Sequence, residues 1–212
     1  MSELFSIQLQ NRQQQGGDGV WLDLPTTTER VQAALRQIGI SSDNPQGLFI
    51  SGYFAEEEKR FAIPYNMVLA SNVDELNFLA SRLETLSTGE RAELNAALQV
   101  PQSELSSIGR ITDFPENVDY YVHLPDVRGP AQLGDYYLNR SGMVDMPEEW
   151  KGGIDTAQFG RYVAQQEQGV FTEYGYLVKS GDEWQKVHEG QPVPEEYRVL
   201  SFPAPEVLRD SA

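Results

Sequence analysis

The sequence predicts an α+β fold made of small consecutive units. Short segments in which apolar and polar residues alternate indicate strands, and segments with apolar residues three and four positions apart indicate helices. Hydrophobic residues make up 40% of the 212 residues, enough to fold one medium domain or two to three small ones. We place the units at residues 1–69, 70–112 and 113–178. An extension over 179–212 follows and contains a strand-like run from Tyr197 to Phe202.

The first unit is predicted to be a small α+β domain. Residues 4–9 alternate in the manner of a strand, and residues 20–24 resume as a second strand after a polar, glycine-rich turn. The two segments are therefore expected to pair as a hairpin. A helix is predicted over residues 29–38, with a glycine directly after it, and a further strand over residues 48–54.

The central unit is predicted to be helical. Asn72 with Glu75, and Ser87 with Glu90, form two potential capping boxes, so a helix is expected to begin at each. After the first box, apolar residues recur at spacings of three and four, which predicts one buried helix face. That face comprises Val73, Leu76, Leu79, Leu83 and Leu86. A short third helix is predicted over residues 103–108.

The third unit is predicted to be α+β with antiparallel strands. A strand over residues 120–124 precedes a helix over residues 131–140, and Asp155 is expected to cap a second helix that ends at Glu167. Residues 170–178 are expected to form the closing strands. Four aromatic residues of the two helices are expected in the core, with a dimer contact as the alternative. They are Tyr136, Tyr137, Phe159 and Tyr162.

Acidic residues exceed basic ones along the whole chain. There are 32 Asp and Glu against 16 Lys and Arg, a formal net charge of −16. Such a surface attracts basic surfaces, and it does not suit direct binding of nucleic acid or anionic lipid. No apolar run approaches the ~18–20 residues of a membrane span, and the N-terminus lacks the pattern of a secretory signal. These features fit a cytoplasmic protein.

The sequence contains few of the residues and motifs that are typical of catalytic sites. It has no cysteine, which excludes disulfides, thiolate catalysis and zinc–thiolate sites, and its two histidines are far apart in sequence. It contains neither a phosphate-binding glycine loop nor a Gly-x-Ser-x-Gly elbow. The neighbouring acids Glu148 and Glu149 are an option for general acid–base chemistry, although such pairs more often form a solvated helix edge. We expect no enzyme activity, no cofactor and no metal site.

Two blocks of the sequence resemble a known family. The first block runs from Asn-Val-Asp-Glu-Leu-Asn at 72–77 to Glu-Leu-Asn-Ala-Ala-Leu at 93–98. The second comprises Asp-Tyr-Tyr at 135–137, Ile-Asp-Thr-Ala-Gln-Phe-Gly-Arg at 154–161 and Gly-Val-Phe at 169–171. In this order they resemble the ArdA antirestriction family of conjugative plasmids and transposons. The likeness covers about residues 1–178 and is looser over 4–68.

The resemblance implies a dimeric, elongated protein whose carboxylates imitate the phosphates of bent B-form DNA. Such a protein occupies the DNA-binding groove of a type I restriction–modification enzyme, at its methyltransferase core, without an active site. It also implies a homodimer through the C-terminal domain, with no direct contact to nucleic acid or membrane. DNA carries one charge per ~1.7 Å of axis, so a dimer with twice the charge of −16 matches only roughly 16 base pairs.

Because this charge is low for a long DNA mimic, either the interspersed bases lie away from the imitating face or the affinity is weak. They are Arg82, Arg91, Arg110, Arg128, Arg140 and Lys151.

The functional residues implied by the resemblance are a set of acids. The acids expected to imitate phosphates are Asp74, Glu75, Glu84, Glu90, Glu93, Asp113, Glu116, Asp119, Asp126, Asp135, Asp145, Glu148, Glu149 and Asp155. Asp155 has a competing role as a helix cap, as do Glu75 and Glu90 as capping-box partners. Two alternatives stay open: a non-enzymatic acidic adaptor for another basic DNA-binding partner, and a hydrolase that uses a carboxylate pair.

Overall fold

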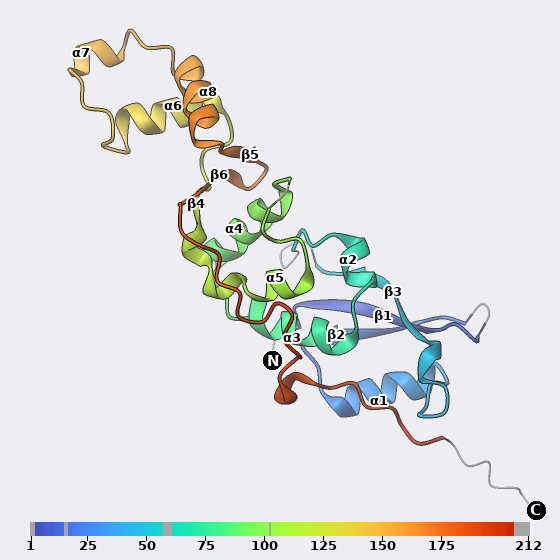
Figure 1. The fold of residues 1–212 in the computed structure, drawn as a ribbon. Coiled ribbons are helices and arrows are strands. Elements are labelled where there is room, and N and C mark those ends of the chain that lie inside the picture. Colours follow the sequence, from blue (N-terminus) through green and yellow to red (C-terminus); the bar gives the residue numbers. More distant parts are fainter. Residues whose placement is uncertain (1–2, 15–16, 57–60, 102, 206–212) are drawn as a thin grey trace, which may run out of the picture. The chain divides into compact units, whose positions relative to one another are not determined.

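The computed structural model describes residues 3–14, 17–56, 61–101 and 103–205. It contains helices and two three-stranded antiparallel sheets, which confirms the predicted α+β class (Figure 1). The chain divides into two compact units. Unit 1 contains residues 1–85, 107–113 and 187–212, and unit 2 contains residues 86–106 and 114–186. The four-part division drawn from the sequence stays a prediction.

Unit 1 is built on the sheet β2-β1-β3. Its strands are β1 (Phe5–Asn11), β2 (Val20–Leu24) and β3 (Leu48–Phe54). The central strand β1 pairs antiparallel with both neighbours, so the predicted hairpin of β1 and β2 is confirmed. Buried and half-buried residues alternate along β1, because successive side chains of a strand point to opposite faces of the sheet.

Helix α1 (Thr28–Gln37) contacts β2 and buries one apolar face. Its end is set by Gly39, whose φ is 65°. The N–H of Gly39 donates to the carbonyl of Arg36, and the N–H of Ile40 donates to the carbonyl of Leu35. This is a Schellman ending, and a residue with a Cβ atom would be strained at its left-handed position. The glycine therefore determines where α1 stops.

Helix α3 (Val73–Leu83) follows the short helix α2 (Tyr65–Leu69) and confirms the first capping box. The N–H of Glu75 donates to the side chain of Asn72 at 2.9 Å, and the N–H of Asn72 donates to the carboxylate of Glu75 at 3.2 Å. The apolar face predicted for this helix is buried. A local sequence pattern therefore determines both the start and the orientation of α3.

The short helix predicted over residues 103–108 is misplaced. The structure forms it later, as α5 (Ile108–Thr112), which contacts α3 in unit 1. Ser107 caps α5, because its hydroxyl accepts the N–H of Arg110 at 3.3 Å. A serine at this position stabilises a helix that begins after it rather than one that ends there.

The strand predicted from Tyr197 to Phe202 is also absent from the structure. The run follows a 3-10 turn, Glu195–Tyr197, and forms no ladder. The N–H groups of Val199 and Leu200 both donate to Oδ1 of Asp74 at 2.7 Å, so a carboxylate takes the place of a neighbouring strand. We call residues 187–205 the returning segment, because they pack in unit 1.

Unit 2 is built on the sheet β4-β6-β5. Its strands are β4 (Tyr121–Leu124), β5 (Val170–Thr172) and β6 (Gly175–Lys179). Its helices are α4 (Thr88–Gln99), α6 (Pro130–Asn139), α7 (Glu148–Lys151) and α8 (Thr156–Glu167). The helix α4 begins at the predicted box of Ser87 and Glu90 and contacts β6. The helices α6 and α8 cross in close contact (Figure 1).

The expected burial of one aromatic residue in unit 2 is wrong. Tyr162 is 60% exposed, whereas Tyr136 and Tyr137 pack against the buried cluster of unit 2 and Phe159 is half-buried. The buried face of α8 is instead set by Gly160 and Ala164, which are four residues apart. Because a residue two positions after Gly160 is turned by about 200°, Tyr162 lies on the opposite side of the helix.

Candidate functional site

The fourteen predicted acids are distributed unequally between the two units. Unit 1 holds four of them: Asp74, Glu75, Glu84 and Asp113. Unit 2 holds the other ten: Glu90, Glu93, Glu116, Asp119, Asp126, Asp135, Asp145, Glu148, Glu149 and Asp155. The acids are thus concentrated in the unit that contains α6, α7 and α8.

Six of the predicted acids have exposed side chains, and all six belong to unit 2. They are Asp119, Asp126, Asp145, Glu148, Glu149 and Asp155. These side chains face solvent, although Glu148 also forms an ion pair with Lys151. We call this set the exposed acids.

Several acids have structural roles as helix caps. The carboxylate of Asp155 accepts the N–H groups of Ala157 and Gln158 at 2.9 and 3.0 Å, which confirms its predicted role as the cap of α8. Hydrogen bonds from Ser87 lower the pKa of Glu90 from its ordinary value, so this carboxylate is ionised at neutral pH. A carboxylate that caps a helix keeps its negative charge, and the hydrogen bonds of the cap fix its position.

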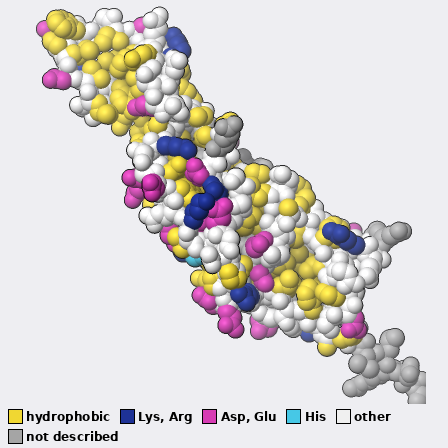
Figure 2. All heavy atoms as spheres, viewed as in Figure 1, with side chains coloured by type: hydrophobic (Ala, Val, Ile, Leu, Met, Phe, Trp, Pro, Cys, Tyr) yellow, Lys and Arg dark blue, Asp and Glu magenta, His cyan; other side chains and the backbone are white. Residues whose placement is uncertain are grey.

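Two of the predicted bases do not lie away from the acids. Arg140 binds Asp135 at 2.7 Å, and Lys151 binds Glu148 at 2.8 Å. The hydrogen bond from Asn139, followed by the charge of Arg140, lowers the pKa of Asp135. Figure 2 likewise shows acidic and basic side chains side by side at several places on one face. Arg140 and Lys151 therefore lie beside predicted acids, where each reduces the local negative charge.

Asp113 is fully buried and serves the fold of unit 1. Its two carboxylate oxygens accept the N–H of His188 at 2.6 Å and the N–H of Glu189 at 3.3 Å. A carboxylate held in this way does not reach a partner, so we remove Asp113 from the set of imitating acids. Its link to the returning segment spans more than seventy residues and has no local sequence signal.

Glu93 is a partly buried acid whose charge state departs from that of the others. Its Oε1 atom is buried and has no hydrogen-bond partner among the described residues. Burial, followed by the negative charges of Glu90 and Asp119, raises the pKa of Glu93 to about 8. At neutral pH this side chain is therefore mostly protonated and resembles no phosphate.

We predict that Glu93 makes unit 2 less stable as the pH rises from about 4.5 to about 8. In this window the folded state holds a proton that the unfolded state has lost, so the free energy of unfolding falls with pH. Because solvent partly screens the group, we expect the Glu93→Gln variant to be roughly 1–2 kcal/mol more stable than the wild type at pH 9 and equally stable at pH 5.

Urea unfolding at pH 5, 7 and 9, followed through amide exchange of α4, measures this difference. The exposed acid Glu149, changed to Gln, is the control, and its difference in stability from the wild type should not change with pH. Parallel stability curves for the wild type and Glu93→Gln would contradict the prediction.

None of the predicted acids lines the cavity of about 260 Å³ that lies in unit 1 between β2 and α1. Within the described ranges, no group of three or more His, Asp or Glu side chains is placed to hold a metal ion. No helix among the described residues is long and apolar enough to cross a bilayer.

A family model described as antirestriction protein (ArdA) matches residues 17–178. The chain belongs to the ArdA antirestriction family. Membership implies an antirestriction function and interaction with restriction enzymes in a general sense, in a family known for non-enzymatic action. A comparison with curated proteins found no match.

The ArdA match includes all fourteen predicted acids and ends before the returning segment. Sequence reasoning missed exposed apolar residues of the matched region, including Trp150, which is 66% exposed. It considered Tyr162, which is 60% exposed, only as an alternative dimer contact. No local pattern separates Trp150 from a core aromatic residue. For Tyr162, the available signal was its position two residues after Gly160, about 200° from the buried face of α8.

Proposed function

We propose that this ArdA protein inhibits type I restriction–modification enzymes as a DNA mimic. The exposed acids of unit 2 would occupy the DNA-binding groove of the methyltransferase core. A groove that binds DNA is lined with basic side chains, which attract a surface that carries several carboxylates. The observation that carries this proposal is that six of the fourteen predicted acids are exposed in unit 2 and lie within the family match. Since its partner acts on DNA inside the cell, we place the protein in the cytoplasm.

We further propose a homodimer that forms through the C-terminal part of the chain, residues 113–178. The most exposed large apolar side chains of this part are Met143, Trp150 and Tyr162, at 74%, 66% and 60%. Exposed apolar and aromatic side chains are typical of protein–protein contacts. A dimer would double the number of carboxylates that face one enzyme.

Neutralising four exposed acids that form no ion pair with another described residue tests the mimicry. The variant combines Asp119→Asn, Asp126→Asn, Asp145→Asn and Glu149→Gln. An exposed charge pair contributes roughly 0.5 kcal/mol, so loss of four should cost about 2 kcal/mol, or about 30-fold in affinity. Competition with DNA for a type I methyltransferase core, measured by fluorescence anisotropy at low and moderate salt, gives this affinity.

The matched control removes the same number of charges from exposed positions of unit 1. It combines Asp18→Asn, Asp43→Asn, Glu195→Gln and Glu196→Gln. We expect this control to stay within about 3-fold of the wild type, because screening weakens charges that lie outside the contact. Equal losses in both variants would show that only net charge matters. A wild-type protein that leaves DNA binding untouched at low salt would refute the mimicry itself.

A further inference from the structure

The outer edge of strand β2 is open in unit 1. In the sheet order β2-β1-β3, β1 occupies one side of β2, and no other described strand pairs with its second side. An edge strand turns every second N–H and C=O group away from its sheet. At the opposite edge, the hydroxyl of Tyr65 donates to the carbonyl of Ser51 on β3 at 3.0 Å. We therefore regard β2 as the edge available for an additional strand.

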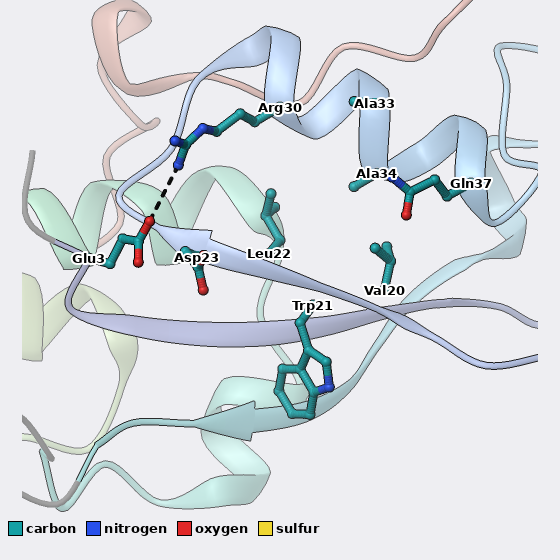
Figure 3. Close-up of a pocket in the computed structure, with 9 residues that line it drawn as sticks. All are labelled: Glu3, Val20, Trp21, Leu22, Asp23, Arg30, Ala33, Ala34 and Gln37. Carbon is teal, nitrogen blue, oxygen red and sulfur yellow. Dashed lines mark ion pairs between the residues drawn. The ribbon is translucent and has the colours of Figure 1, made fainter.

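A groove runs beside this edge, between β2 and α1. Its volume is about 260 Å³, below the ~300–1,000 Å³ of sites that enclose small-molecule ligands. That size suits one or two side chains. Figure 3 shows Val20 and Leu22 pointing toward α1, and Ala34 facing them from the helix; Ala33 also lines the groove, from an exposed position. The two alanines leave room that a larger residue would fill.

The opposite side of β2 has a different chemistry. Trp21 points away from α1 in Figure 3 and is 49% exposed. Asp23 follows on the same side of the strand, and its carboxylate accepts the hydroxyl of Ser6 at 2.6 Å. The guanidinium of Arg30, which also lines the groove, binds Glu3 at 3.6 Å. Asp23 therefore has no cation beside it among these lining residues.

We propose that the edge of β2 binds an extended segment of a partner protein as an added strand with alternating apolar and basic residues. Its apolar side chains would enter the groove against Val20 and Leu22. Its basic side chains would lie on the side of the strand that carries Asp23, whose carboxylate attracts a cation. Side chains on one face of a strand are about 6.7 Å apart, which matches the spacing of Val20 and Leu22. This mode is independent of the proposed DNA mimicry.

The test uses an eight-residue, end-blocked peptide of alternating valine and lysine and the isotope-labelled full chain. We expect amide shifts confined to β2 and α1. The matching peptide of valine and glutamate should bind at least 10-fold more weakly. A Val–Lys peptide with proline at its centre should also lose at least 10-fold, because proline removes a ladder hydrogen bond.

Two substitutions of the same type locate the site. Ala33→Phe, at an exposed position of the groove, should weaken Val–Lys binding at least 10-fold, whereas Ala131→Phe, at an exposed position of α6, should leave it unchanged. The four-acid variant of unit 2 should also bind the peptide as the wild type does, which separates this proposal from the mimicry. Amide shifts spread over unit 2, or unchanged binding by Ala33→Phe, would overturn strand addition at β2.

Discussion

Replacing Gly160 with alanine is expected to destabilise unit 2 by about 3 kcal/mol. A Cβ atom at Gly160 would lie 1.8 Å from the carbonyl oxygen of Pro130, and one at Gly134 would lie 2.0 Å from that of Thr156. Both obstacles are backbone atoms, which cannot turn aside as the end of a flexible side chain can. The helices α6 and α8 would have to separate by more than an ångström.

For Gly160→Ala, the expected loss of stability from the steric clash exceeds the gain from the higher helix propensity of alanine. Alanine is favoured over glycine inside a helix by about 1 kcal/mol, whereas overpacking costs roughly 1–3 kcal/mol and more where the backbone must move. Separation of the helices would also loosen the buried cluster of Val127, Leu133, Ala164 and Tyr176. Because this cluster belongs to the unit that carries the exposed acids, the variant should lose antirestriction activity as well.

Gly89 provides a matched control on another helix of unit 2. A Cβ atom at Gly89 would meet no heavy atom within 4 Å, so Gly89→Ala should stabilise α4 by roughly 0.5–1 kcal/mol. Amide exchange of α6 and α8 in urea measures both variants unit by unit, since two units need not unfold together. A Gly160→Ala protein as stable as the wild type would show that α6 and α8 tolerate a wider crossing.

Replacing Asp113 with alanine is expected to cost about 3 kcal/mol and to release the returning segment. The variant removes the carboxylate that accepts the N–H groups of His188 and Glu189. Both N–H groups then lose this hydrogen bond. A hydrogen bond to a charged group contributes roughly 1.5–3 kcal/mol. The ring of His188 also packs edge-on against Phe78, with centroids 4.9 Å apart, and this contact should loosen with the backbone.

Amide exchange of residues 187–200 measures this release directly, and we expect exchange roughly 100-fold faster than in the wild type. The control is Asp43→Ala, an exposed acid of the same unit, which should leave these rates unchanged. Unit 2 should keep its stability in the Asp113 variant. Unchanged exchange of the returning segment would mean that its other anchors, such as Asp74, hold it without Asp113.

Local structure could be predicted where short-range patterns decide it. The alternation along β1 and the stripe of α3 depend on the periods of the strand and the helix, and a capping box depends on residues three positions apart. The resemblance to the ArdA family likewise depended on short blocks of sequence, and the family match confirms it. The position of α5 was missed because Ser107 is one of several serines able to cap a helix there.

The amino-acid sequence by itself determined the α+β class, the main helices and strands, the family and the net negative charge. Only the tertiary structure decided which acids face solvent, because that depends on contacts between distant residues. It buries Asp113 under the returning segment, leaves Glu93 partly buried near other acids, and pairs Arg140 with Asp135. Charge is a property of composition, whereas its availability to a partner depends on burial and pairing, which the folded chain alone sets.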